Sequence, residues 1–133
     1  MMPNDIEFAS FIVPEDGPGW IIDSARPVMA KAQRWRAGEI GRAPGTTSVV
    51  EGGAGPQTRQ IFENYEATLE KLGSGLEDIV KCTVFLEDMA NYAAINEAYA
   101  AAFPGNKPAR STMGVDGLAL GAAVEIECLA VKS

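Results

Sequence analysis

The sequence predicts an α+β fold in which two helices lie on one face of a mixed β-sheet. Two apolar stripes with helical spacing, within residues 55–73 and 92–103, predict the helices. Alternating apolar and polar residues at 78–86 and 122–131 predict two strands of the sheet. No βαβ unit repeats along the chain, which favours an α+β sandwich.

The length of 133 residues is typical of one domain, so we expect residues 1–133 to form a single domain. Within residues 1–32, proline and glycine interrupt every short apolar run, which indicates extended segments joined by turns. A strand is expected within residues 33–41, around Trp35, and the turn-forming residues 41–45 follow it.

The first predicted helix starts at Gly55 and Pro56, with proline at the first helical position, where its missing N–H removes no hydrogen bond. The helix ends at Gly73, a residue suited to a left-handed stop. Its apolar stripe consists of Ile61, Phe62, Tyr65, Leu69 and Leu72. The glycines within 52–55 are assigned to a turn and the helix start, because the lysine and the spacing of a phosphate-binding P-loop are missing.

The strand at 78–86 is expected to have two distinct faces, with Val80, Cys82, Val84 and Leu86 on one and Ile79, Lys81, Thr83 and Phe85 on the other. The second predicted helix follows this strand, with Asp88 as a candidate cap and residues 104–105 as its end. Its apolar stripe consists of Tyr92, Ile95, Tyr99, Ala102 and Phe103.

The last two strands are predicted at residues 110–115 and 122–131. In the second of them, one face carries Val124, Ile126, Cys128 and Ala130, and the other carries Glu125, Glu127, Leu129 and Val131. Two helices cover only one face of such a sheet. The apolar side chains on the uncovered face therefore predict burial against another subunit in a homo-oligomer; they are Ile79, Phe85, Leu129 and Val131.

The composition excludes several classes of function. The chain has no histidine, which removes Ser-His-Asp and Cys-His catalysis and every imidazole-based zinc or haem site. The net charge of -7 makes a nucleic-acid partner a poor candidate. Cys82 and Cys128 lie in alternating apolar runs and are expected to be buried, reduced thiols of a cytosolic protein. We expect no metal, no membrane span and no signal peptide.

Two groups of residues could carry chemistry. Arg110 follows a loop and opens a strand, where its paired donors could bind a carboxylate; alternatively, it is a surface arginine or part of an intersubunit salt bridge. Glu125 and Glu127 project from one face of their strand. They are either charges that protect an exposed edge strand or part of an Arg–Glu site at a subunit seam, which binds an acid and orients a water.

Four segments together resemble the RidA family, also called the YjgF family: residues 57–64, 78–86, 108–111 and 124–127. The resemblance extends over residues 38–131, and the N-terminal segment 1–32 is divergent. It implies a chorismate-mutase-like fold and a homotrimer with a barrel-like core and three clefts between subunits. It also implies a cofactor-free hydrolase of the 2-iminobutanoate/2-iminopropanoate deaminase type, which converts reactive 2-imino acids, tautomers of enamines, to 2-keto acids and ammonia. The cysteines, by contrast, are what indicate a cytoplasmic location.

By position, the resemblance implies that Arg110 clamps the substrate carboxylate. Glu125 would polarise the attacking water or protonate the departing nitrogen. Gly38 and the backbone of Thr112 would line the cleft, with Asn96 nearby. The chain departs from the family pattern at Ala37, Glu39 and Thr112, where the family has serine, glutamine and cysteine.

Those departures keep other functions open. The chain could be a non-catalytic small-molecule-binding trimer, or a deaminase of a catabolic intermediate such as 2-aminomuconate. The ribonuclease activity ascribed to some relatives is disfavoured by the negative charge and the missing histidines. We therefore expect a small carboxylate as partner, and neither nucleic acid nor membrane.

Overall fold

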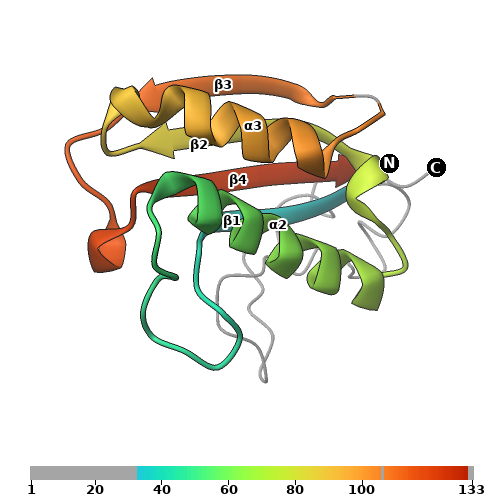
Figure 1. Cartoon of the computed structure of the whole chain (residues 1–133). Coiled ribbons are helices and arrows are strands. Elements are labelled where there is room, and N and C mark those ends of the chain that lie inside the picture. Colours follow the sequence, from blue (N-terminus) through green and yellow to red (C-terminus); the bar gives the residue numbers. More distant parts are fainter. Residues whose placement is uncertain (1–32, 106, 132–133) are drawn as a thin grey trace, which may run out of the picture.

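The structure is a computed structural model, and it describes residues 33–105 and 107–131. Predictions for residues 1–32 lie outside the described residues. Two helices, α2 (Ala54–Lys71) and α3 (Tyr92–Ala102), lie side by side on one face of a four-stranded sheet (Figure 1). The strands are β1 (Gln33–Ile40), β2 (Ile79–Leu86), β3 (Ala109–Gly114) and β4 (Val124–Val131). The predicted α+β class is confirmed.

The strand order in the sheet is β1-β4-β2-β3. β4 pairs antiparallel with both β1 and β2, whereas β2 and β3 are parallel, so the sheet is mixed as predicted. A parallel pair needs a crossover connection, and α3 supplies it between β2 and β3. Among the described residues, this order leaves β1 and β3 as the two edges of the sheet.

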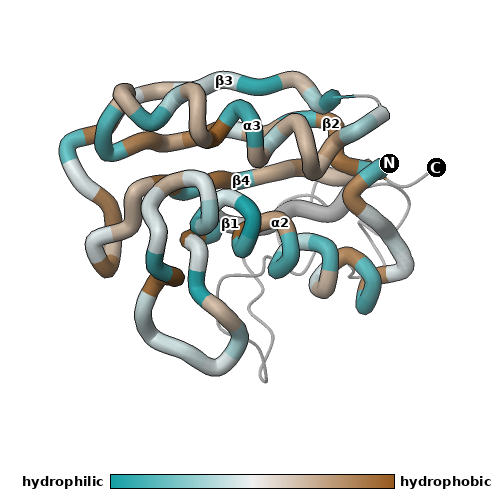
Figure 2. Tube along the Cα trace, viewed as in Figure 1, coloured by the Kyte–Doolittle hydropathy of each residue, from teal (hydrophilic) through white to brown (hydrophobic). Residues whose placement is uncertain are grey.

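The hydrophobic core fills the layer between the helices and the sheet. Figure 2 shows apolar stretches along β2 and β4, and buried residues of these strands form one hydrophobic cluster with buried residues of α2 and α3. The Phe62 ring of α2 packs edge-on against Tyr99 and Phe103, at centroid distances of 5.7 and 5.0 Å, and so joins the two helices. The Tyr65 hydroxyl donates a 2.9 Å hydrogen bond to the Ile126 carbonyl, which ties α2 to the central strand β4.

The first helix begins slightly earlier than the sequence predicts. Gly53, with a φ of 85°, is the N-cap, so Pro56 is the third helical residue rather than the first. Pro56 still lies in the first turn, where backbone N–H groups have no partner inside the helix, and no hydrogen bond is lost. At the other end Gly73 has a φ of 73°, which confirms the predicted left-handed stop.

The predicted faces of β2 are wrong at its first two residues. Ile79 is only 5% exposed and Val80 is 44% exposed, the reverse of the expected pattern. The pairing of β2 with β4 shifts register between Ile79 and Lys81, and such an irregularity inverts the alternation of side chains on one side of it. Beyond the shift the predicted alternation is correct, and it is correct throughout β4.

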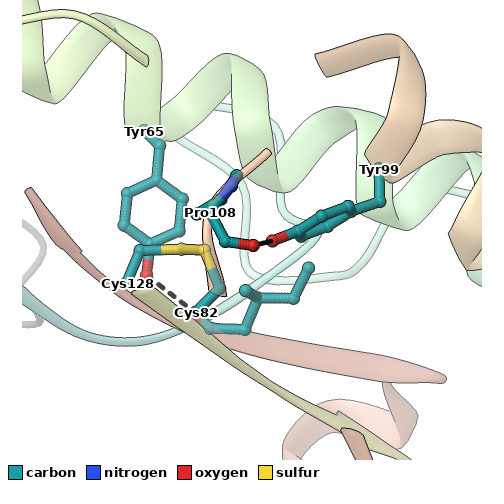
Figure 3. Close-up of a disulfide and its surroundings, with 6 residues drawn as sticks. Tyr65, Cys82, Tyr99, Pro108 and Cys128 are labelled. Carbon is teal, nitrogen blue, oxygen red and sulfur yellow. Dashed lines mark hydrogen bonds between the residues drawn. A yellow bond between two sulfur atoms is a disulfide. The ribbon is translucent and has the colours of Figure 1, made fainter. Parts of the chain in front are cut away.

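The two cysteines are buried as predicted, but the prediction that they are reduced is wrong. Cys82 of β2 and Cys128 of β4 are direct register partners, with 4.2 Å between their Cα atoms, and they form a disulfide under Tyr65 (Figure 3). They are 46 residues apart in sequence, so only the strand register brings them together. The disulfide joins the two central strands of the sheet.

Candidate functional site

Arg110 lies near the start of the edge strand β3, where α3 holds its side chain. Its Nη2 donates hydrogen bonds to Asn96 Oδ1 at 2.7 Å and to the Tyr92 hydroxyl at 3.1 Å. The guanidinium carbon lies 4.7 Å from the centre of the Tyr99 ring and 5.5 Å from that of the Tyr92 ring. Two hydrogen bonds and two cation–π contacts fix the guanidinium on the helix side of the sheet.

The spacing of residues along α3 explains this cradle. Tyr92, Asn96 and Tyr99 are four and three residues apart, so they lie on one helix face. The Tyr99 hydroxyl donates a 3.4 Å hydrogen bond to the Pro108 carbonyl, two residues before Arg110 (Figure 3). Burial raises the pKa of Tyr99, an effect that the positive charge of Arg110 partly opposes. Tyr99 therefore remains a neutral hydrogen-bond donor near neutral pH.

Glu125 lies near the start of β4, on the face of the sheet away from the helices. Its register partners are Ile40 of β1 and Phe85 of β2. A side chain at Gly38 would collide with the Glu125 carboxylate, so the space for this carboxylate depends on a glycine there. Burial raises the pKa of Glu125, and the charge of Glu127 on the same face raises it further.

The start of β4 is tied to its neighbours by hydrogen bonds at one residue. Ala123 donates its N–H to Gln57 Oε1 of α2 at 2.9 Å, and its carbonyl accepts from the N–H of Glu87 at 3.2 Å. Gly41 lets β1 approach α2 closely, because a Cβ there would lie 2.7 Å from the Gln57 Cα. These contacts position the strand that carries Glu125.

A cavity of about 490 Å³ opens beside Glu125. The ionisable residues of its lining are Glu125, Glu39 and Arg42, and Ile40, Ala119 and Leu120 give it apolar surface; Gly38 completes the lining. Leu120 is 57% exposed and has a φ of 57°, an uncommon conformation for a residue other than glycine. The cavity can therefore accept a small molecule with an apolar portion and a group that reacts near the carboxylate.

Within one chain, Arg110 and Glu125 are not brought together. Glu125 points from the sheet face away from the helices, on β4 next to β1, whereas Arg110 reaches α3 from β3, two strands away. We call Arg110 with Tyr92 and Asn96 the arginine half-site, and Glu125 with Gly38 the glutamate half-site. A complete Arg–Glu pair requires a second copy of the chain.

Three further residues were singled out from the sequence, namely Thr112, Asn96 and Glu39. Thr112 follows Arg110 by two residues on β3, and its buried Oγ1 has no hydrogen-bond partner within the described part of the chain. Asn96 contacts Arg110, as described above. Glu39 is only 3% exposed and is in register with the buried Ile126, so its side chain lies toward the helices and not on the uncovered face with Glu125.

Tyr92 is a residue that sequence reasoning assigned wrongly. The helical stripe predicts it to be part of the core, but it is 41% exposed and contacts Arg110 instead. Because Tyr92 is the first residue of α3, the end of the helix carries it beyond the core. The four-residue spacing from Asn96 is the signal that could have placed both residues beside one partner.

The described residues include no cluster of three or more cysteine, aspartate or glutamate side chains that could hold a metal ion. Neither helix of residues 33–105 and 107–131 is both long enough and apolar enough to span a membrane.

The family model described as endoribonuclease L-PSP matches residues 27–132. A RutC family protein of Pyrococcus horikoshii is 39% identical over 121 residues, 91% of this chain and 96% of that protein. A rat protein named 2-iminobutanoate/2-iminopropanoate deaminase is 35% identical over 96 residues, 72% of this chain and 70% of the relative. Reactive Intermediate Deaminase A of Arabidopsis thaliana, a chloroplastic protein, is 34% identical and covers 87% of this chain and 62% of its own length.

Solved structures give the same result for the fold. The crystal structure of the YjgF gene product of E. coli superposes with a TM-score of 0.76 and 29% identity, over 94% of this chain and 95% of that chain. Yeast Mmf1 superposes with a TM-score of 0.71 and 36% identity, over 77% and 86% of the two chains.

Proposed function

The chain belongs to the RidA family, and on this premise we propose that it is a hydrolytic deaminase of 2-imino acids and their enamine tautomers. The products would be a 2-keto acid and ammonia. The observation that carries the proposal is the pair of half-sites: a guanidinium held rigidly for an anion, and a carboxylate whose pKa is raised beside a cavity. Relatives named as imine or reactive-intermediate deaminases support an enzyme of this class.

The position of the half-sites favours a cyclic assembly. The arginine half-site lies at the β3 edge and the glutamate half-site near the β1 edge, so two copies must meet through different surfaces. Such head-to-tail contacts close into rings, and we propose a homotrimer with three equivalent clefts. Its barrel-like core would bury the uncovered sheet face, where Phe85, Leu129 and Val131 are only half-buried in one chain.

In each cleft Arg110 would bind the substrate carboxylate. Its Nη2 is occupied by Asn96 and Tyr92, and the other guanidinium nitrogens make no hydrogen bond to the described residues. They can therefore offer donors to a carboxylate, as arginine does in carboxylate recognition. Thr112 lies two residues further along the same strand, and its backbone would line the cleft.

Glu125 would act on water at the imine carbon. As the water oxygen bonds to the carbon of the protonated imine, the carboxylate takes one proton from the water and a neutral carbinolamine forms. Glu125 then gives this proton to the nitrogen, the C–N bond breaks, and the carboxylate takes the hydroxyl proton of the carbinolamine as the carbonyl forms. One protonated imine and one water give one keto acid, one ammonia and the proton held by Glu125, which passes to ammonia or solvent. The raised pKa of Glu125 brings this carboxyl closer to neutral pH, where both proton transfers are efficient.

The test uses 2-imino acids generated in situ by an amino-acid oxidase, with semicarbazide trapping the imine that remains. The wild-type protein should prevent trapping, and Arg110→Ala should lose at least ~100-fold in kcat/KM, because a charged hydrogen-bonding group is removed. Arg59→Ala is the matched control, since Arg59 is an exposed arginine on α2 outside both half-sites. Full turnover by Arg110→Ala would contradict the proposal.

A carboxylate-binding trimer without turnover is the second candidate. It is favoured by the arginine half-site, whose hydrogen bonds are complete within one chain, whereas the reacting pair needs two. Calorimetry with 2-ketobutyrate, combined with the imine assay, separates the two functions. Binding without turnover of any imine in a panel, including 2-aminomuconate, would select the binding function.

Two further expectations remain predictions. RNA cleavage, which the family description would suggest, is disfavoured by the net charge of -7 and the absence of histidine from the sequence. A cytoplasmic location is also a prediction, since relatives include the mitochondrial protein mmf1 of Schizosaccharomyces pombe and a chloroplastic protein.

A further inference from the structure

The Tyr92 side chain is not part of the hydrophobic core. It is 41% exposed at the first turn of α3, yet its hydroxyl lies 3.1 Å from Arg110 Nη2. The ring also lies under the guanidinium, with 5.5 Å from the guanidinium carbon to the ring centre. A phenylalanine would keep this ring contact, so the hydroxyl needs a separate explanation.

The hydrogen-bond donors and acceptors show what the hydroxyl can do. A guanidinium only donates, so the Tyr92 oxygen accepts from Arg110 and its own proton points elsewhere. No described residue accepts that proton from Tyr92. An O–H donor is thus held beside the guanidinium, on a side chain that is 41% exposed.

We propose that Tyr92 is a substrate-binding residue whose hydroxyl donates a hydrogen bond to the carboxylate held by Arg110. The inference rests on the proposed function and names a further contact in the same site. An ionised carboxylate accepts about four hydrogen bonds, so the arginine leaves acceptor positions free for the phenol. The added donor would favour ligands with an ionised carboxylate next to the reacting carbon over esters and amides of the same acids.

The first experiment compares Tyr92→Phe with the wild-type protein in the imine assay. The variant keeps the ring under Arg110 and loses only the hydroxyl. KM for 2-iminobutanoate should rise about tenfold while kcat changes less than about twofold, because the hydrogen bond is made equally in the ground and transition states. The dissociation constant of 2-ketobutyrate, measured by calorimetry, should rise by a similar factor.

Tyr65→Phe is the matched control, because it also removes one tyrosine hydroxyl. That hydroxyl bonds to the Ile126 carbonyl in the core. The control should lower the melting temperature and leave KM and 2-ketobutyrate binding unchanged. Tyr92→Phe should show the opposite pattern, since Tyr92 is exposed.

A second background separates direct contact from an effect transmitted through Arg110. Tyr92→Phe is introduced into Arg110→Lys, which keeps the charge and loses the planar guanidinium. If Tyr92 contacts the ligand, 2-ketobutyrate binding weakens again in the double variant. If Tyr92 only orients the guanidinium, the second substitution has no effect, and the inference is overturned.

The outcomes also separate this inference from the proposed function. Wild-type protein that neither binds 2-ketobutyrate nor hydrolyses imines would refute the function itself. Wild-type protein that does both, with an unchanged KM in Tyr92→Phe, would overturn only the role of Tyr92. A fall in kcat at constant KM would equally overturn it, because a binding contact does not act in that way.

Discussion

The arginine half-site and the glutamate half-site are held in different ways. Arg110 has two hydrogen bonds and two aromatic rings from α3, so one chain alone fixes its position. Glu125 lies on β4, and its carboxylate occupies the space that a side chain at Gly38 would fill. Contacts with α3 therefore preorganise the arginine half-site, whereas the glutamate half-site depends on the space left by the missing Cβ of Gly38.

This difference has a physical reason. A guanidinium that binds an anion gains from fixed geometry, because fewer rotamers are lost when the ligand arrives. A carboxylate that exchanges protons gains from partial burial and from a like charge nearby, which raise its pKa. Substitutions in the two half-sites should therefore differ in their effect on turnover and on ligand binding.

Glu125→Gln should have the largest effect. Turnover should fall by about 10²–10⁴-fold, because the proton acceptor is lost, while 2-ketobutyrate still binds at Arg110. Steady-state imine hydrolysis and calorimetry measure the two effects. In the wild-type protein the rate should fall as pH drops through the raised pKa of Glu125, and this acidic limb should be absent in the variant. Equal losses of binding and turnover would show that the half-sites are not separable.

The same variant should be more stable than the wild-type protein at neutral pH. A carboxyl whose pKa is raised on folding opposes folding where it is ionised, above that pKa, and the penalty disappears as pH falls below its ordinary value. The melting temperature of Glu125→Gln should therefore exceed that of the wild-type protein at pH 7, and the difference should shrink toward pH 4. The opposite trend would contradict the raised pKa.

Gly38→Ala should have the next largest effect. The added Cβ collides with the Glu125 carboxylate and must displace it, so we expect a loss of at least ~10-fold in kcat with ligand binding retained. Gly105→Ala is the matched control, since a Cβ at Gly105 meets no atom within 4 Å. A fully active Gly38→Ala would mean that the carboxylate need not occupy this position.

Asn96→Ala should act on the other half-site and less strongly. Arg110 Nη2 loses its 2.7 Å acceptor and retains the Tyr92 hydroxyl, so the guanidinium becomes less fixed. KM should rise about tenfold, in line with the loss of one charged hydrogen bond, and kcat should change little. A variant with unchanged KM would show that the two tyrosine rings suffice to hold Arg110.

Breaking the disulfide should have the smallest effect on turnover and a clear effect on stability. Cys82 lies on β2 and is in register with Arg110 on the neighbouring strand. Cys128 lies on β4, the strand that carries Glu125, so the disulfide connects the surroundings of the two half-sites. A cross-link over 46 residues contributes about 2–4 kcal/mol to folding. Calorimetric melting with and without reductant should show this loss, with kcat at 25 °C unchanged. Two free thiols in the native, unreduced protein would contradict the disulfide.

Local patterns predicted much of the fold. The stripe through Ile61, Tyr65 and Leu69 and the alternation from Val124 to Val131 identified elements and faces correctly, because both depend on fixed repeats of helix and strand. Arg110 and Glu125 could also be selected from sequence, since a loop-to-strand arginine and paired glutamates on a strand are local features. Their placement on opposite faces, with β2 between the strands that carry them, could not be predicted, because it depends on the strand order and register.

The sequence by itself determined the two helices, the strand faces beyond the register shift in β2 and the residue types available for chemistry, since these follow from spacing and composition. Only the tertiary structure decided that Cys82 meets Cys128, that Val80 faces outward and that Tyr92 leaves the core for Arg110. Each of these depends on the register or packing of segments far apart in the chain, which no local repeat encodes.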